Sequence, residues 1–120
     1  MPATDEKRRW PRYTFDVPVT ITTSGNRKIQ GRGTELNEGG LTVHGEAELA
    51  LGDELKVEFR PAFSTAAVNL TVVVRNQNGN RYGMEFVGRT HLERQEIALL
   101  RTIVKMLEAR VSYYGEQAAK

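Results

Sequence analysis

Two polar segments of the chain carry side chains suited to binding an anion or a purine base. The sequence KRRWPR, residues 7–12, contains Arg8, Arg9 and Arg12 around a tryptophan and a proline. The sequence GTELNEGG, residues 33–40, contains the carboxylate of Glu35 and the carboxamide of Asn37 before two glycines. Arginine matches phosphate oxygens or the O6/N7 edge of guanine, and a carboxylate can accept hydrogen bonds from guanine N1 and N2. Together, the two segments predict a site for a guanine nucleotide.

Each segment also has a simpler interpretation when it is taken alone. Residues 7–12 are then a solvated basic leader that only keeps the chain in solution. Residues 35–40 are then a polar turn, with Gly39 and Gly40 in left-handed conformations. We expect Glu35, Asn37 and Gly40 to lie in a loop between two strands, where extended backbone would point residues 35 and 37 the same way.

The sequence contains few signs of catalysis or metal binding. His44 and His91 fall in different predicted elements, without a carboxylate cluster at ligand spacing, and the chain has no cysteine. Neither a zinc site nor a histidine-activated nucleophile is therefore predicted, and both histidines are expected at the surface. The glycines of residues 31–40 fit neither GxGxxG nor a P-loop. We expect a binding protein that is not an enzyme and that needs no metal or cofactor.

Length and composition favour a single folded domain. The chain has 120 residues, of which 39% are hydrophobic and 27% are charged. No apolar run is long enough for a membrane span, and the first residues lack the apolar segment of a secretory signal, so we expect a cytoplasmic location. The formal net charge is only +2. This value argues against a nucleic-acid polymer as the partner and favours a compact anionic ligand.

Alternating hydrophobicity predicts six short strands. The runs are residues 13–21, 28–34, 41–43, 55–59, 68–74 and 82–86, and turn residues at 24–26 and 76–80 predict two hairpins. Because no helical pattern separates the strands, we expect an all-β fold with a C-terminal helix. A six-stranded antiparallel β-barrel is favoured over a sandwich.

The final helix is predicted from its capping residues and its periodicity. Thr90 is the expected N-cap, with Glu93 in capping-box register, and the helical pattern continues to about Val111. The predicted organisation is a flexible leader at 1–12, a barrel at 13–89, a helix at 90–112 and a short tail at 113–120 that frays.

The predicted helix carries two neighbouring apolar stripes. The stripe that would close the open end of the barrel consists of Ile97, Leu100, Val104, Leu107 and Val111. Leu99, Ile103 and Met106 form a second stripe, which has two interpretations. It either extends the contact with the barrel or forms a surface for another subunit, as in a homodimer through the C-terminal helix.

The order of these pieces resembles the PilZ domain family of bacterial cyclic di-GMP receptors. RRWPR is followed by a strand with Val17-Pro18-Val19, then by ELNEGG, LALGDELKVEF and RYGMEF, which together extend over about residues 7–111. The resemblance implies a six-stranded antiparallel barrel with a C-terminal helix, in agreement with the strand and helix pattern. It also implies that cyclic di-GMP is the ligand.

The first motif of that family is RxxxR. Arg8 and Arg12 match its two arginines, which in the family engage the phosphates and guanines of the ligand while the N-terminal leader closes over it. Arg9 would be an auxiliary contact. Trp10 would stack on a purine or, as we prefer, anchor the leader against the barrel.

The second family motif is D/N-x-S-x-x-G, and the chain departs from it. Gly40 matches the glycine, but Glu35 stands at the Asp/Asn position and Asn37 at the serine position. Both replacements keep hydrogen-bonding groups, so the resemblance implies a weakened rather than an abolished site. Arg75 and Arg81, in or beside the last hairpin, are further candidates for the same pocket, although a solvated strand edge explains them equally well.

Two functions from different classes follow from the sequence. The first is a cyclic di-GMP receptor that changes conformation when the ligand orders its leader, and that acts on an unknown downstream protein. The second is a PilZ-like interaction adaptor that has lost nucleotide binding. Binding of RNA or single-stranded DNA is a weaker third hypothesis, because few exposed aromatic residues are available for base stacking.

Overall fold

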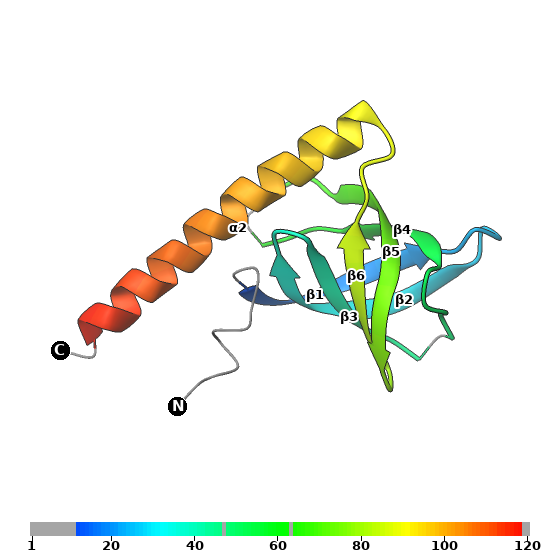
Figure 1. The fold of residues 1–120 in the computed structure, drawn as a ribbon, viewed down its shortest axis with the longest axis horizontal. Helices are drawn as coiled ribbons and strands as arrows, with labels where there is room; N and C mark the ends of the chain where they lie inside the picture. The colour runs from blue at the N-terminus through cyan, green and yellow to red at the C-terminus, as the bar shows by residue number, and fades with distance from the viewer. Residues whose placement is uncertain (1–11, 47, 63, 119–120) are drawn as a thin grey trace.

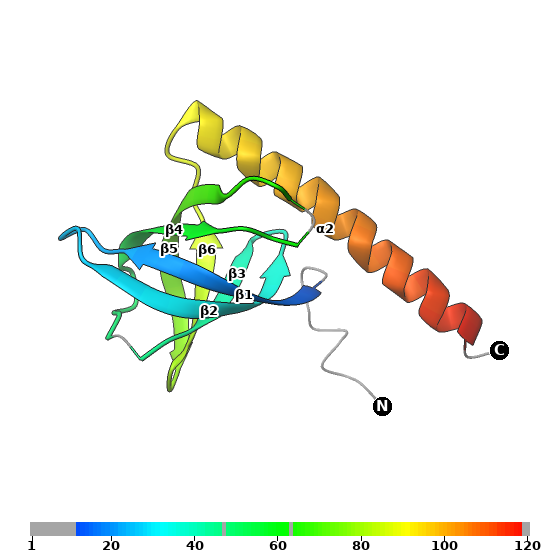
Figure 2. The same ribbon diagram turned by 180° about the vertical axis from the view of Figure 1, so that it is seen from behind.

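The chain folds into a closed β-barrel followed by one long helix (Figures 1 and 2). The computed structural model describes residues 12–46, 48–62 and 64–118, with the side chains of residues 16–107 within these ranges. The strands are β1 (Arg12–Thr22), β2 (Lys28–Asn37), β3 (Gly40–His44), β4 (Glu54–Phe59), β5 (Val68–Asn78) and β6 (Arg81–Phe86), and the helix is α2 (His91–Ala118). The strand order around the barrel is β1-β2-β3-β6-β5-β4, and every pair is antiparallel. The predicted fold is confirmed.

The strands follow the predicted alternation, but two of them are longer than expected. β2 continues to Asn37, so the expectation that Glu35 and Asn37 lie in a loop is wrong. Both residues pair with β1 instead, because Glu35 is opposite Thr14 and Asn37 is opposite Arg12. β5 continues through residues 76–78, which were expected in the turn, and only Gly79 and Asn80 connect it to β6.

The core is formed by the inward-facing residues of all six strands together with one face of α2. In β4 the burial alternates strictly, with Leu55, Val57 and Phe59 buried between exposed neighbours, as expected for a strand with one face in the core. From the helix, Ile97, Leu100 and Val104 are buried in the same cluster. The first three residues of the predicted stripe therefore pack on the barrel, as expected, whereas Leu107 is only partly buried and the side chain of Val111 lies outside the described part of the chain.

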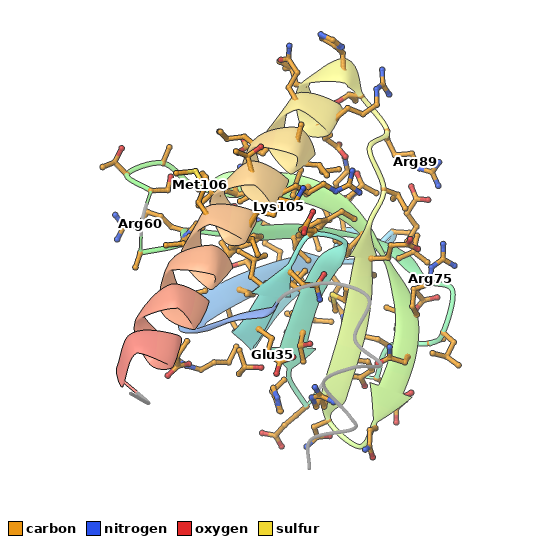
Figure 3. The ribbon with its side chains drawn as sticks, turned by 60° about the vertical axis from the view of Figure 1, so that its left-hand side comes forward. Glu35, Arg60, Arg75, Arg89, Lys105 and Met106 are labelled. Atoms are coloured by element: carbon orange, nitrogen blue, oxygen red, sulfur yellow. The ribbon has the colours of Figure 1, made fainter. Side chains whose placement is uncertain are left out.

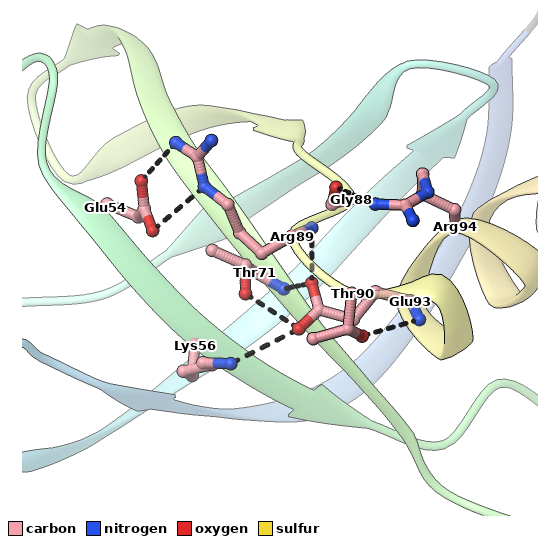
Figure 4. A network of polar contacts seen from close by, with 8 residues as sticks. All are labelled: Glu54, Lys56, Thr71, Gly88, Arg89, Thr90, Glu93 and Arg94. Atoms are coloured by element: carbon pink, nitrogen blue, oxygen red, sulfur yellow. Dashed lines mark hydrogen bonds and ion pairs between the residues drawn. The ribbon is translucent and has the colours of Figure 1, made fainter.

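The start of α2 is anchored to the barrel through Glu93 (Figure 4). The hydroxyl of Thr90 accepts a hydrogen bond from the Glu93 amide at 3.1 Å, which confirms Thr90 as the N-cap. The Glu93 carboxylate extends away from its own helix and accepts from the amide and hydroxyl of Thr71, at 3.1 and 3.0 Å, and from Lys56 Nζ at 3.2 Å. The backbone amide of Arg89 also points to it, at 3.4 Å. This carboxylate therefore connects α2 to β4 and β5.

The environment of Glu93 favours its ionised form. Burial opposes ionisation most strongly, but the hydrogen bonds from Thr71 and Lys56 together outweigh burial and hold the pKa of Glu93 below its ordinary value of 4.5. Nearby, Arg89 donates two hydrogen bonds to the exposed carboxylate of Glu54, and this interaction lowers the pKa of Glu54. The buried carboxylate therefore fixes the helix, whereas the exposed pair contributes little.

The helix is longer than the sequence pattern predicts. It was expected to end at residue 112, with a fraying tail beyond, but α2 continues to Ala118. In Figures 1 and 2 its C-terminal part extends beyond the barrel. Within the part of the chain that the structure describes, no helix is both long enough and apolar enough to cross a membrane.

Candidate functional site

A polar cleft of about 450 Å³ lies on the outer face of the barrel, where β2, β3, β5 and β6 meet. Five residues that the sequence analysis proposed for the ligand lie in its lining: Glu35, Asn37, Gly40, Arg75 and Arg81. Figure 3 shows the positions of Glu35 and Arg75 on this part of the barrel. The fold therefore brings the ELNEGG segment and the last hairpin into one site.

The strand geometry of β2 directs Glu35 and Asn37 into this cleft. Leu36, which lies between them, is fully buried in the barrel core. Since side chains alternate along a strand, residues 35 and 37 face outward together. The prediction that they point the same way is confirmed, although they do so from a strand rather than from a loop.

Asn37 shapes the turn between β2 and β3. Its Oδ1 atom accepts hydrogen bonds from the backbone amides of Gly39 and Gly40, both at 2.8 Å. An asparagine side chain that caps the amides two and three residues ahead stabilises a tight turn. Oδ1 is thus committed to the turn, and Nδ2 is the atom of this carboxamide that is suited to donate to a ligand.

Gly40 is required by the close approach of β3 to β6. A Cβ atom built on Gly40 would lie 2.9 Å from the carbonyl carbon of Met84 and 3.0 Å from Cα of Glu85, and closer still to the Met84 oxygen. Gly40 does not have a positive φ angle. Its role in the motif is therefore to admit a neighbouring backbone, and the expectation of left-handed conformations at Gly39 and Gly40 is wrong.

The cations of the described cleft are each paired with a carboxylate. Arg81 Nη2 lies 3.6 Å from Glu35 Oε1 between β6 and β2, and Arg75 Nε lies 2.6 Å from Glu85 Oε1 between β5 and β6. All four side chains keep access to solvent. Two positive and two negative groups leave this part of the cleft without net charge, so it offers hydrogen-bonding groups of both kinds rather than a strong attraction for anions.

Irregular strand pairing sets the direction of two of these side chains. The pairing of β2 with β3 shifts by one residue between Gly33 and Glu35, and the pairing of β5 with β6 shifts between Val74 and Asn76. Each shift is a β-bulge, which turns the following side chains and increases the local twist. Glu35 follows one bulge and Arg75 lies within the other.

Arg12 begins β1, and its backbone pairs with that of Asn37. It therefore belongs to the barrel rather than to the leader in which the sequence analysis placed it. The second arginine of RxxxR thus lies, by its backbone, next to the last residue of β2. Arg8, Arg9 and Trp10 lie outside the described residues, and the structure leaves their predicted roles untested.

Seven residues of the lining were not predicted from the sequence: Gly39, Leu41, Thr42, Asn76, Gly83, Met84 and Glu85. Gly83 makes room for Asn76, since a Cβ atom at residue 83 would lie 2.7 Å from Asn76 Cγ. A signal for Gly83 and Glu85 was present in RYGMEF, because Tyr82, Met84 and Phe86 face the core and the residues between them must face outward.

The turn of the cleft is also connected to the helix. Arg101 Nε of α2 donates a 2.7 Å hydrogen bond to the backbone carbonyl of Glu38, which lies between Asn37 and Gly39. Glu38 is itself buried, at 6% exposure. This contact joins the β2–β3 turn to α2 directly.

Metal ligation is not indicated in the described part of the chain, where no group of three or more histidine or acidic side chains is arranged for an ion. His44 and His91 are both exposed, as expected from the sequence.

Comparisons with known proteins agree with this arrangement. The sequence matches the family model of the PilZ domain over residues 6–104. No curated protein matches the sequence significantly. Among solved structures, the PilZ domain of YcgR from Escherichia coli with c-di-GMP has a TM-score of 0.62 and 15% identity, covering 92% of this chain and 98% of that one.

Two longer proteins contain a similar fold. A structure of Escherichia coli YcgR in complex with c-di-GMP has a TM-score of 0.68 and 18% identity, over 93% of this chain and 50% of that one. The Bacillus subtilis inhibitor of motility, MotI/DgrA, has a TM-score of 0.64 and 17% identity, over 84% and 51%. The chain spans about half the length of these two structures. Since the family match covers most of the sequence and the barrel with its helix has the same fold, this chain belongs to the PilZ domain family.

Proposed function

We propose that this protein is a receptor for cyclic di-GMP, with the cleft of β2, β3, β5 and β6 as part of the ligand site. The observation that carries the proposal is the convergence of Glu35, Asn37 and the backbone of Arg12 at one end of β2. Arg12 matches the second arginine of RxxxR, and Glu35 and Asn37 stand at the Asp/Asn and serine positions of the second motif. Related structures contain c-di-GMP in YcgR.

The charge balance of the cleft assigns separate roles to the two motifs. The described cations, Arg75 and Arg81, are already paired with carboxylates. The two phosphates of the ligand therefore need the arginines of KRRWPR, namely Arg8, Arg9 and Arg12. The cleft itself supplies Glu35 as an acceptor for guanine N1 and N2 and Asn37 Nδ2 as a donor.

The Glu35 carboxylate faces the cleft beside Arg81 and keeps access to solvent. The two groups are 3.6 Å apart, beyond the distance of a strong charge-assisted hydrogen bond, and the Glu35 side chain is 23% exposed. A guanine edge would share the Glu35 carboxylate with Arg81 or replace it. Arg81 would then be available for O6 or N7 of the same base.

Titration calorimetry with cyclic di-GMP tests the proposal. We expect saturable heat for the wild-type chain. Arg12→Ala should lose about ten- to a hundredfold in affinity, because it removes one charge-assisted hydrogen bond, which contributes about 1.5–3 kcal/mol. Arg27→Ala is the matched control, since Arg27 is an exposed arginine in the turn between β1 and β2, and its affinity should be that of the wild type. A folded wild-type chain that gives no heat at about 100 μM refutes the proposal.

The motif replacements are tested by restoring the family residues. Glu35→Asp with Asn37→Ser shortens the acceptor and removes the bulkier amide. A strong rise in affinity would show that the natural pair weakens the site, whereas an unchanged affinity would show that the variant strand end binds equally well. Both results require binding by the wild type, which keeps this question separate from the first one.

The second candidate function is an interaction adaptor without nucleotide binding, favoured by the departures at Glu35 and Asn37. It predicts no heat with cyclic di-GMP for the wild type or for the restored chain. A flexible leader before Arg12, a downstream protein partner and a cytoplasmic location stay predictions.

A further inference from the structure

The outer face of α2 carries an apolar stripe that the barrel does not cover. Leu92, Leu99 and Met106 are 75%, 55% and 66% exposed, and they account for three of the four large exposed hydrophobic residues among those described. Figure 3 labels Met106 on this helix. The three residues are spaced by seven, with Ile103, partly exposed, between the last two. We call these four residues the outer stripe.

The outer stripe has the spacing of a helix-pairing surface. Leu92, Leu99 and Met106 repeat like one apolar position of a heptad, and Ile103 occupies the second apolar position. At 100° per residue, this stripe is turned by about a third of a circle from the face that packs on the barrel. The two apolar faces of α2 are therefore separate, and the interpretation of the second stripe as more of the barrel contact is wrong.

The C-terminal part of α2 continues past the residues that pack on the barrel. Among the helix side chains that the structure describes, Val104 is the last buried one, yet the helix continues to Ala118. The 14 residues from 105 to 118, which we call the extension, span roughly 21 Å. Because helices in proteins gain most of their stability from tertiary packing, a surface that packs along this extension would stabilise it.

We propose that α2 pairs in antiparallel orientation with α2 of a second copy of this chain, through the outer stripe. In this arrangement the extension of each helix lies along Leu92 and Leu99 of the other. A twofold axis near the middle of the helix, close to Ile103 and Met106, then relates the two copies. The extension of each copy covers the outer stripe of the other.

The charge of Glu96 selects the antiparallel orientation. Glu96 lies on the same helix face as the outer stripe, seven residues before Ile103, and so occupies the second heptad position. A parallel pair would place the two Glu96 carboxylates against each other in the seam, whereas an antiparallel pair places them far apart. The antiparallel pair also puts the two barrels at opposite ends, so neither cleft is crowded.

The oligomeric state of the full chain tests the pairing. Light scattering after size exclusion, at a chain concentration of about 100 μM, should give the dimer mass for the wild type and the monomer mass for Leu99→Asp. Leu51→Asp is the matched control, because Leu51 is 64% exposed but lies in the turn before β4, and this variant should stay dimeric. Circular dichroism and the melting temperature check that each variant is folded. A monomeric wild type, or a dimer that Leu99→Asp leaves intact, overturns the proposal.

Disulfide trapping tests the orientation, and the absence of cysteine gives a clean background. Met106→Cys lies near the proposed axis and should crosslink under mild oxidation. Leu92→Cys should not, because the two copies of residue 92 are then about 38 Å apart along the axis. Crosslinking of both variants would establish a parallel pair and overturn the antiparallel proposal, as would crosslinking of neither. Cyclic di-GMP titration is independent of these results, so failure of the dimer and failure of the receptor are distinguishable.

Discussion

Replacing Gly40 by alanine would push a methyl group into the backbone of the neighbouring strand. The new Cβ atom would lie 2.9 Å from the Met84 carbonyl carbon, where ordinary contacts are 3.4–4 Å, and nearer still to the Met84 oxygen. The obstacle is strand backbone, which cannot rotate away as a flexible side chain could. β3 and β6 must therefore separate at this end of the barrel.

The cost follows from the hydrogen bonds that this separation would break. Gly40 pairs with Glu85, and the amide of Phe86 donates a 2.9 Å hydrogen bond to the carbonyl of Gly39. Losing two or three backbone hydrogen bonds, at about 0.5–1.5 kcal/mol each, lowers the free energy of unfolding by about 1–4.5 kcal/mol. For a domain of this size the melting temperature falls by about 4 °C per kcal/mol, so we expect a decrease of about 4–18 °C.

Thermal unfolding followed by circular dichroism measures this decrease. Gly45→Ala is the matched control at the other end of β3, where a new Cβ atom would meet nothing closer than Cα of Gly31, at 3.7 Å. Its melting temperature should stay within about 2 °C of the wild type, since its cost is well under 1 kcal/mol. A Gly40→Ala chain that melts with the wild type but fails to bind cyclic di-GMP would refute the structural role and assign Gly40 to the ligand.

Two further predictions concern Glu93 and Asn37. Glu93→Gln weakens the contacts with the barrel and should lower the free energy of unfolding by about 1–3 kcal/mol in urea titrations, whereas Glu54→Gln, at an exposed pair, should leave it unchanged. Because folding lowers the pKa of Glu93, its contribution is present above pH 4.5 and is lost as the pH falls through the folded value. The wild type should therefore lose stability below pH 4.5 more steeply than Glu93→Gln, and parallel losses would contradict the assignment. Asn37→Ala leaves the amides of Gly39 and Gly40 without their acceptor and should cost about 1–3 kcal/mol, while Asn37→Asp should restore the turn; equal melting of all three chains would exclude a capping role.

The strand pattern allowed much of the fold to be predicted from local sequence. Alternation in residues 55–59 and 82–86 marks the face that enters the core, and Thr90 marks the start of the helix by a hydrogen bond within one turn. The ends of elements were harder to predict. Polar residues such as Asn76 and Glu35 look like turn residues, yet pairing with a neighbouring strand keeps them extended. The propensity of a residue does not indicate which strand it will pair with.

The sequence alone determined the order of the elements, the inward and outward faces of the strands, and the family motifs with their departures at Glu35 and Asn37. These features depend on residues that are close along the chain. Only the tertiary structure decided that Glu35 lies across from Arg81, that Gly40 is required by the backbone of β6, and that Glu93 binds the barrel rather than its own cap. Each of these contacts joins residues that are distant in the sequence, and barrel closure with its bulges sets which of them meet.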